Sequence, residues 1–183
     1  TNTTPGTTDM TAAIQAAIDS QNTYGGTVRF GRTVYGVTAL TMVGTNYAGV
    51  NLKGTGSTNA SELRHLGSGT APMITVTGVA DGFLTMTWED LYIHGVDNVP
   101  HGVKLIGIQM FTLRNVHIRV CNYGLWIVGS QNFTIHEPYF INNVIGIKAE
   151  PRLTPVLITP NQIRIHGGLI AGSSSRAILA DSM

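Results

Sequence analysis

The sequence predicts an all-β protein, a parallel β-helix of short stacked strands with one capping α-helix at its N-terminal end. Three observations predict this class. An alternating apolar and polar pattern recurs from residue 50 onward, 22 glycines and frequent threonines favour strands and tight turns, and only one segment has helical periodicity. Hydrophobic residues make up 43% of the 183 positions, so the chain can bury one sizeable core.

The single helix is expected over about residues 9–20, where Thr8 and Asp9 offer an N-cap. Its apolar residues recur at helical spacing, at Met10, Ala13, Ile14, Ala17 and Ile18. A β-helix has an open sheet edge at each end, and an uncovered edge promotes aggregation. We therefore expect Ile14 and Ile18 to lie over the first coil.

The chain divides into an N-terminal cap, residues 1–49, and β-helix coils, residues 50–183. Besides the helix, the cap contains two segments with strand-like alternation, 27–30 and 33–37. No second helix follows the last strand, which ends near Ala180. We therefore expect further coils or a partner chain to cover the C-terminal end.

The coils are visible as four segments that align without gaps and share one apolar and polar pattern. They cover residues 86–93, 111–118, 133–140 and 163–170, and a weaker fifth copy begins at Val50. Each of the four is followed by a second alternating strand, at 102–105, 124–127, 146–149 and 177–180. Asp81-Gly82 is the only two-residue hairpin signal, which disfavours antiparallel hairpins. Fewer than six coils are expected, stacked at the inter-strand spacing of about 4.8 Å.

Three segments at the start of the chain resemble the pectate-lyase-like family of right-handed parallel β-helices. They are DMTAAIQAAID at 9–19, GGTVRF at 25–30 followed by Tyr35, and VNLKGTG at 50–56. The family includes bacterial polysaccharide lyases, glycosidases and many bacteriophage tailspikes. The resemblance implies a right-handed parallel β-helix and a polysaccharide substrate. It assigns no catalytic residue by motif, and residues 31–35 depart from the Pro-x-Gly-x-Tyr pattern usual in the family.

Composition excludes several classes of function. Charged residues make up only 11% of the chain and the net charge is +1, so no basic surface for nucleic acid is expected. No apolar run is long enough to span a bilayer, so no membrane insertion is expected. The single cysteine, Cys121, rules out an internal disulfide. The six histidines do not form ligand-spaced pairs, so we expect no metal and no cofactor.

The alignment of coils predicts which side chains share a row on the surface. Glu89, Arg114 and His136 belong to one row, and Asp90 and Glu137 to the corner that follows it. Two coils separate Asp90 from Glu137, about 10 Å. Inverting glycosidases hold their carboxyl groups about 6.5–9.5 Å apart. The predicted catalytic residues are therefore Glu137, Asp90 and Glu89, with Arg114 and His136 in substrate binding.

Among these carboxylates, Glu137 is the expected acid, because Pro138, Tyr139 and Phe140 would shield it from water. Asp90 would stay ionised and act as base or nucleophile. No nucleophile triad or Tyr–Arg pair offers a better site. The alternative is that the corner residues serve backbone geometry alone, as Asp and Asn commonly do in turns.

The second strands predict another outward row, in which Trp126 lies between Lys104 and Lys148. These three residues are predicted to bind substrate, with a sugar ring stacked on the indole and acidic substituents at the lysines. Two alternatives remain open, a cation–π stack that only stabilises adjacent coils and a subunit interface.

The expected function is binding and cleavage of a bacterial surface or extracellular polysaccharide, as in a phage tailspike depolymerase. A homotrimer is expected, at an extracellular or virion-associated location. One alternative is a secreted bacterial pectin or glycan lyase or glycosidase. Another is a β-helix with a structural or adhesive role and no enzymatic activity.

Overall fold

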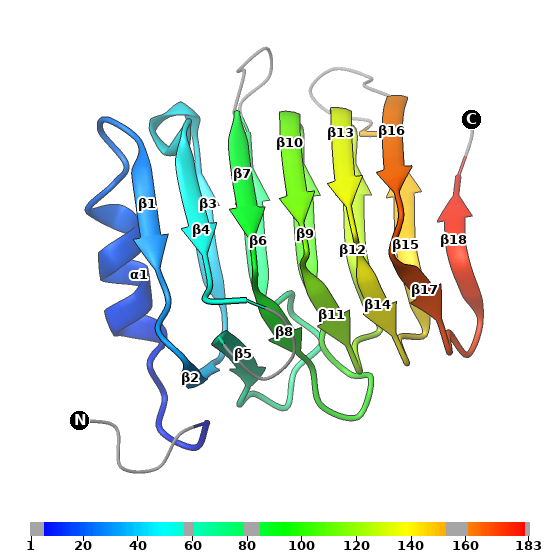
Figure 1. Cartoon of the computed structure of the whole chain (residues 1–183), viewed down its shortest axis with the longest axis horizontal. Helices are drawn as coiled ribbons and strands as arrows, with labels where there is room; N and C mark the ends of the chain where they lie inside the picture. Colours follow the sequence, from blue (N-terminus) through cyan, green and yellow to red (C-terminus); the bar gives the residue numbers. More distant parts are fainter. Residues whose placement is uncertain (1–5, 57–60, 79–84, 153–160, 182–183) are drawn as a thin grey trace.

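The computed structural model describes residues 6–56, 61–78, 85–152 and 161–181, and they form a parallel β-helix (Figure 1). Three six-stranded sheets run along the molecule, and every pair of neighbouring strands in them is parallel. Each coil of the chain contributes one strand to each sheet. The predicted fold class is therefore confirmed, but the described residues form six coils and not fewer.

The sheets are named here after their first strands. The β1 sheet contains β1 (Gly26–Arg29), β4 (Val50–Lys53), β7 (Met86–Glu89), β10 (Gln109–Arg114), β13 (Gln131–His136) and β16 (Asn161–His166). The β2 sheet contains β2 (Thr33–Val37), β5 (Ser61–His65), β8 (Tyr92–His94), β11 (His117–Arg119), β14 (Tyr139–Ile141) and β17 (Leu169–Ala171). The β3 sheet contains β3 (Leu40–Val43), β6 (Ile74–Thr77), β9 (Val103–Ile106), β12 (Tyr123–Val128), β15 (Ile145–Glu150) and β18 (Arg176–Ala180).

The core lies between the three sheets as columns of apolar side chains, one residue from each coil. One column of the β1 sheet consists of Leu52, Trp88, Leu113, Ile135 and Ile165. The first four are fully or almost fully buried, whereas Ile165, on the last coil described, is 36% exposed. This order confirms the register predicted from the four aligned segments.

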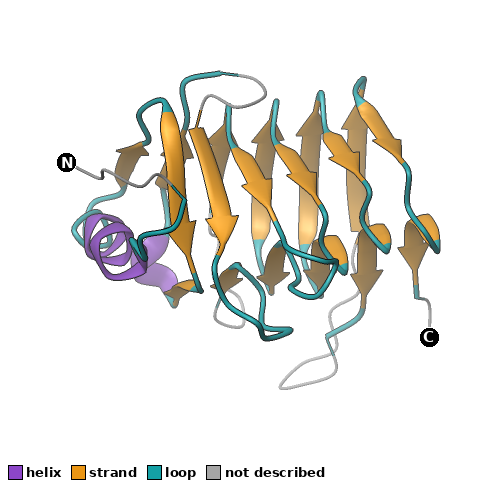
Figure 2. Cartoon of the chain, turned by 90° about the horizontal axis from the view of Figure 1, so that it is seen from below, coloured by secondary structure: helices purple, strands orange, loops and turns teal. Residues whose placement is uncertain are grey.

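Helix α1 (Thr11–Asp19) covers the first coil, as predicted (Figures 1 and 2). Ile14 and Ile18 are buried, and the Asp9 carboxylate accepts a hydrogen bond from the Thr11 amide. Gln15 satisfies the open edge of β3 through its side-chain amide. Its Nε2 donates to the Thr41 carbonyl at 2.8 Å and its Oε1 accepts from the Thr41 amide at 2.9 Å. An amide side chain thus replaces the missing neighbouring strand.

The two strands predicted in the cap, β1 and β2, pair with β4 and β5 and so belong to the first coil. A single-turn 3-10 helix, η1 (Thr45–Tyr47), connects β3 to the second coil. Within the described residues, no helix is long and apolar enough to cross a membrane.

Candidate functional site

The outer face of the β3 sheet brings the predicted substrate-binding residues together. In register, Lys104 of β9 pairs with Trp126 of β12, and Trp126 pairs with Lys148 of β15. Their neighbours Leu125 and Ile127 point inward and are fully buried. Because side chains alternate along a strand, all three predicted residues lie on the outside. Each is only partly exposed.

A network of close contacts joins these residues. The Lys104 ammonium lies over the Trp126 ring, 3.5 Å from its centroid. The indole Nε1 donates a hydrogen bond of 2.9 Å to Oε1 of Glu150. The second oxygen of Glu150 lies 2.7 Å from the Lys148 ammonium. Lys104 therefore occupies one face of Trp126, as the cation–π alternative predicts, and a sugar would stack on that face only after Lys104 moved.

Two further rings complete the cluster. His101 lies 4.4 Å from the ring of Tyr123 and 4.9 Å from that of Trp126, measured between centroids. Tyr123 and Trp126 meet edge to face at 5.2 Å. Reasoning from the sequence missed both residues and did not place Glu150 in this cluster. The usable signal for Glu150 was its position two residues after Lys148, which places both side chains on one face of β15.

Burial and charge shift the titration of this cluster. Burial lowers the pKa of Lys104, with Glu150 partly opposing the shift and Lys148 adding to it. Burial also lowers the pKa of His101, and the two lysines lower it further. For Lys148, burial opposes the charged form, but the Glu150 carboxylate outweighs it and the pKa is raised. His101 therefore stays neutral at neutral pH, next to two ammonium groups.

The predicted catalytic carboxylates Asp90 and Glu137 occupy the corner between the β1 and β2 sheets. Both residues, like Asn115 between them, have positive φ, at 58°, 48° and 49°. The Asn115 side chain donates a 2.7 Å hydrogen bond to the Asp90 carboxylate, and the Gly168 amide donates one of 3.1 Å to Glu137. Asp90 and Asn115 suit this corner, because Asp and Asn adopt the left-handed conformation more readily than most residues, a preference that Glu137 does not share.

One expectation about Glu137 is wrong. Its side chain is exposed, so the neighbouring residues do not shield it. Pro138 and Phe140 are buried and turned into the fold, whereas Tyr139 is 37% exposed on the other face of its strand. Alternation along β14, which starts directly after the corner, separates these side chains from the carboxylate.

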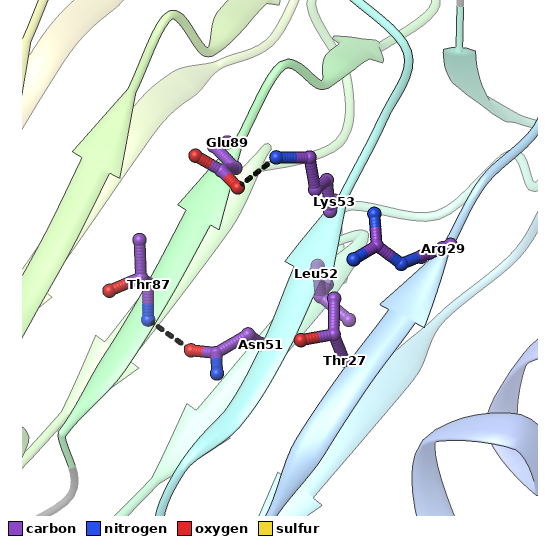
Figure 3. A pocket seen from close by; sticks show the side chains of 7 residues that line it. All are labelled: Thr27, Arg29, Asn51, Leu52, Lys53, Thr87 and Glu89. Carbon is purple, nitrogen blue, oxygen red and sulfur yellow. Dashed lines mark hydrogen bonds and ion pairs between the residues drawn. The ribbon is translucent and has the colours of Figure 1, made fainter.

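The third predicted carboxylate, Glu89, lies on the outer face of the β1 sheet. It forms an ion pair of 2.6 Å with Lys53 at the wall of a shallow pocket (Figure 3). The pocket is lined by Thr27, Arg29, Asn51, Leu52, Lys53, Thr87 and Glu89. The structure therefore separates Glu89, which faces this pocket, from the corner carboxylates.

The predicted binding residues Arg114 and His136 share the row of Glu89, in agreement with the sequence alignment. Arg114 is exposed, and the ring of His136 stacks on that of His166 at 4.9 Å. Neither residue contacts the cluster on the β3 sheet, here called the lysine–aromatic cluster, which consists of His101, Lys104, Tyr123, Trp126, Lys148 and Glu150. The predicted site residues thus fall into three groups, on the β3 sheet, on the β1 sheet and at the corner between the β1 and β2 sheets.

Cys121 is a packed residue and not a nucleophile. Its thiol is buried, and burial raises its pKa to about 12. A thiolate is therefore strongly disfavoured at neutral pH. In the part of the chain that the structure describes, no three His, Cys, Asp or Glu side chains lie close enough to hold a metal ion.

No family model and no curated protein matches the chain. The chain does match solved structures. The chain is similar to the ORF18 protein of Geobacillus virus E2, at 23% identity and a TM-score of 0.74, over 88% of this chain and 33% of that one. It is also similar to the A-module of the mannuronan C-5 epimerase AlgE4 of Azotobacter vinelandii, at 20% identity and a TM-score of 0.75, over 96% of this chain and 50% of that one. The chain spans about half or less of each neighbour, and the likeness shows a shared fold.

Proposed function

We propose that the protein binds an acidic polysaccharide across the outer face of the β3 sheet. The observation that carries this proposal is the half-buried Lys104. Glu150 pairs with Lys148, so among the described residues Lys104 has no carboxylate within ion-pair distance and rests on the Trp126 ring instead. A partly desolvated cation without an anionic partner gains from binding a ligand carboxylate.

The arrangement of the cluster suits a polymer that runs along the molecule, across the strands. Lys104, Trp126 and Lys148 lie on three successive coils, which repeat at the inter-strand spacing of about 4.8 Å. Trp126 and Tyr123 lie between the two ammonium groups, with Lys104 3.5 Å from the Trp126 centroid and Lys148 5.0 Å from that of Tyr123. A sugar would stack on these rings when the ammonium groups move onto its carboxylates. A chain of sugar units can therefore meet cations and rings in turn.

The structural neighbours support a carbohydrate ligand. One is named as an epimerase of mannuronan, which is an acidic polysaccharide, and the other is a protein of a bacterial virus. An extracellular or virion-associated location and a homotrimer belong to the same proposal. Light scattering at micromolar concentration tests the oligomer, and a monomer would contradict it.

A binding assay on polysaccharides of different charge tests the main proposal. Polygalacturonate and alginate should bind, neutral dextran should not, and added salt should weaken binding because it screens the charges. Lys104→Gln should weaken binding about tenfold, or about 1.4 kcal/mol. Arg32→Gln, at an exposed arginine outside the cluster, is the matched control. Equal binding of dextran and polygalacturonate would overturn the proposal.

Cleavage is a second candidate function, and the register of the corner favours it. Asp90 and Glu137 lie two coils apart with Asn115 between them, which corresponds to about 10 Å at the inter-strand spacing, close to the separation of about 6.5–9.5 Å in inverting glycosidases. Product analysis distinguishes the mechanisms, because hydrolysis yields saturated ends whereas a lyase yields an unsaturated uronate. Glu137→Gln should cost several powers of ten in rate while binding persists. Full activity in both Glu137→Gln and Asp90→Asn would exclude the corner.

A further inference from the structure

The outer face of the β2 sheet carries a second cluster of charged and aromatic side chains, away from the lysine–aromatic cluster. Four strands, from β5 to β14, contribute two outward rows. One row is Glu62, Tyr92, His117 and Tyr139, and the other is Arg64, His94, Arg119 and Ile141. Within this face, the side chains of Tyr92 and Arg119 interact.

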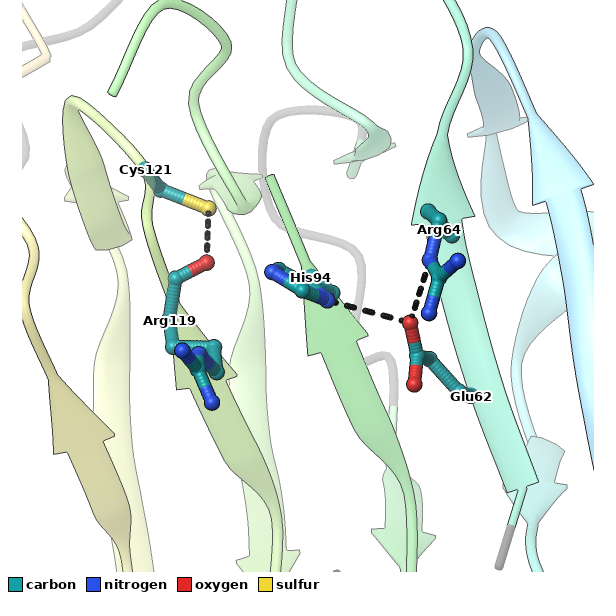
Figure 4. A network of polar contacts seen from close by, with 5 residues as sticks. All are labelled: Glu62, Arg64, His94, Arg119 and Cys121. Carbon is teal, nitrogen blue, oxygen red and sulfur yellow. Dashed lines mark hydrogen bonds and ion pairs between the residues drawn. The ribbon is translucent and has the colours of Figure 1, made fainter. Parts of the chain in front are cut away.

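At one end of this face, the charged side chains already form ion pairs and hydrogen bonds with one another. The buried Glu62 carboxylate lies 2.7 Å from Arg64 Nε and 3.0 Å from His94 Nδ1 (Figure 4). Burial alone would raise the pKa of Glu62, but the hydrogen bonds from His94 and Arg64 outweigh it and hold the pKa below its usual range. The charges at this end already have their partners, so the end offers little to a ligand.

The other end holds an arginine without a carboxylate. Arg119 is half-buried and its Nε is buried with no hydrogen-bond partner. Within the described ranges, no Asp or Glu lies within ion-pair distance of it. Its backbone carbonyl is held by the Gly95 amide at 2.9 Å and by the Cys121 thiol at 3.3 Å (Figure 4). A positioned, partly desolvated guanidinium gains strongly from an anion, which it can bind through two parallel hydrogen bonds.

Ring surface lies on the same face of the sheet, two residues along the strands from this arginine. His117, two residues before Arg119, packs its ring against that of Tyr139 at 4.8 Å between centroids. Tyr139 is 37% exposed, and Ile141 is the strand partner of Arg119. The patch therefore combines one cation with an aromatic and an aliphatic surface, over an area of two neighbouring strands.

We propose that Arg119, Tyr139 and Ile141 form a second carbohydrate-binding site, which takes one acidic sugar unit. The carboxylate of the sugar pairs with Arg119, and the apolar face of its ring packs on Tyr139. This site shares the ligand class of the proposed function but none of its residues. Either site can therefore fail without the other.

Calorimetric titration of the whole chain with short oligouronates tests the proposal. The wild-type protein should bind at two sites, and Arg119→Gln should remove one of them, weakening it at least tenfold. Arg119→Lys should recover only part of the affinity, because lysine lacks the planar fork. Arg32→Gln should retain both sites. Lys104→Gln should weaken the other site alone, so loss of the proposed function and loss of this site give different results.

Tyr139→Ala provides a second variant at an exposed position, for the case that Arg119→Gln does not fold. It should weaken the same site and leave the other unchanged. Unchanged titrations for folded Arg119→Gln or Tyr139→Ala would overturn the proposal. So would inorganic sulfate or phosphate that binds as tightly as the oligouronate, because the ring contact would then contribute nothing.

Discussion

Polar side chains of successive coils are in register in two regions, the outer face of the β3 sheet and the corner between the β1 and β2 sheets. The two regions differ in what holds these residues in place. At the corner, Asp90, Asn115 and Glu137 adopt positive φ and are held by hydrogen bonds along the corner. On the β3 sheet, Lys104 and Trp126 extend from regular strands and meet each other through their side chains.

The difference shows how a β-helix separates structure from surface chemistry. At a corner, the backbone conformation favours particular residue types, so a carboxylate there can be explained by the turn alone. A residue in the middle of an outward row has no such constraint, because a regular strand accommodates most side chains there. An unusual outward row, such as two lysines around a tryptophan, is therefore stronger evidence for a ligand than a carboxylate at a corner.

Both regions depend on the same core, and breaking it should have the largest effect. Ile135→Asp places an unpaired charge at a fully buried position of the column inside the β1 sheet. We expect no cooperative unfolding transition by circular dichroism. Thr134→Asp, at the outward neighbour on the same strand, is the control and should melt cooperatively. A cooperative melt of Ile135→Asp would contradict the register of the coils.

The second largest effect is expected from loss of the Trp126 indole, which should weaken ligand binding on the β3 sheet. Trp126→Ala removes the ring under Lys104 and the donor to Glu150. We expect acidic polysaccharide to bind at least about tenfold more weakly, about 1.4 kcal/mol, by affinity electrophoresis or calorimetry. Trp126→Phe keeps an aromatic ring but loses the N–H donor, so its affinity for the polysaccharide should lie between those of the wild-type protein and Trp126→Ala. Unchanged binding by Trp126→Ala would leave the cation–π contact a purely structural feature.

At the corner, the backbone should matter more than the charge. Asn115→Ala forces a residue without a side-chain donor into a conformation with φ of 49° and removes the hydrogen bond to Asp90. We expect a loss of about 1–2 kcal/mol in the free energy of unfolding, measured in urea. Asn115→Gly should recover most of it, because glycine adopts positive φ readily. If the two variants were equally unstable, the hydrogen bond and not the backbone would dominate.

The smallest expected effect is a loss of stability in mild acid. Burial lowers the pKa of His65, His101 and His117 in the folded state, so below about pH 6.5 the unfolded state takes up protons that the folded state does not. Glu62 has a lowered pKa, so its contribution is present above the unfolded value of about 4.3 and is lost as the pH falls further.

Melting temperatures between about pH 7 and pH 4 should therefore decrease steadily. His117→Gln should make the decrease between about pH 6.5 and pH 5 shallower. A melting temperature that rises with acid would contradict the assignment of these histidines as neutral.

Much of the fold could be predicted because the coils repeat an apolar pattern. The alignment of four segments placed Trp88, Leu113, Ile135 and Ile165 in one column, which the strand pairing confirms. It did not reveal β3, β5 and β6, and it assigned β1 and β2 to the cap, so the first coil was not counted. Those strands lie among turns of different lengths, and four or five residues of alternation carry too little signal without their neighbours.

The candidate site was predicted in part for the same reason. The row of Lys104, Trp126 and Lys148 follows from alternation along the strands. His101 and Tyr123 were missed because each directly precedes the glycine that begins a predicted strand, where side-chain direction depends on the turn. The Glu62–His94 pair joins β5 to β8, neighbouring strands of the β2 sheet that belong to successive coils. No local pattern places such residues side by side.

The sequence by itself determined the class of fold, the helix over the first coil and the columns of the core. Each of these follows from where apolar side chains recur, and burying them is the main favourable contribution to folding. Only the tertiary structure decided which charges meet, that Glu150 joins Lys148 to Trp126, and that Lys104 and Arg119 have no carboxylate partner among the described residues. Those contacts join different coils, so they depend on turns and corner conformations that place each strand against the next.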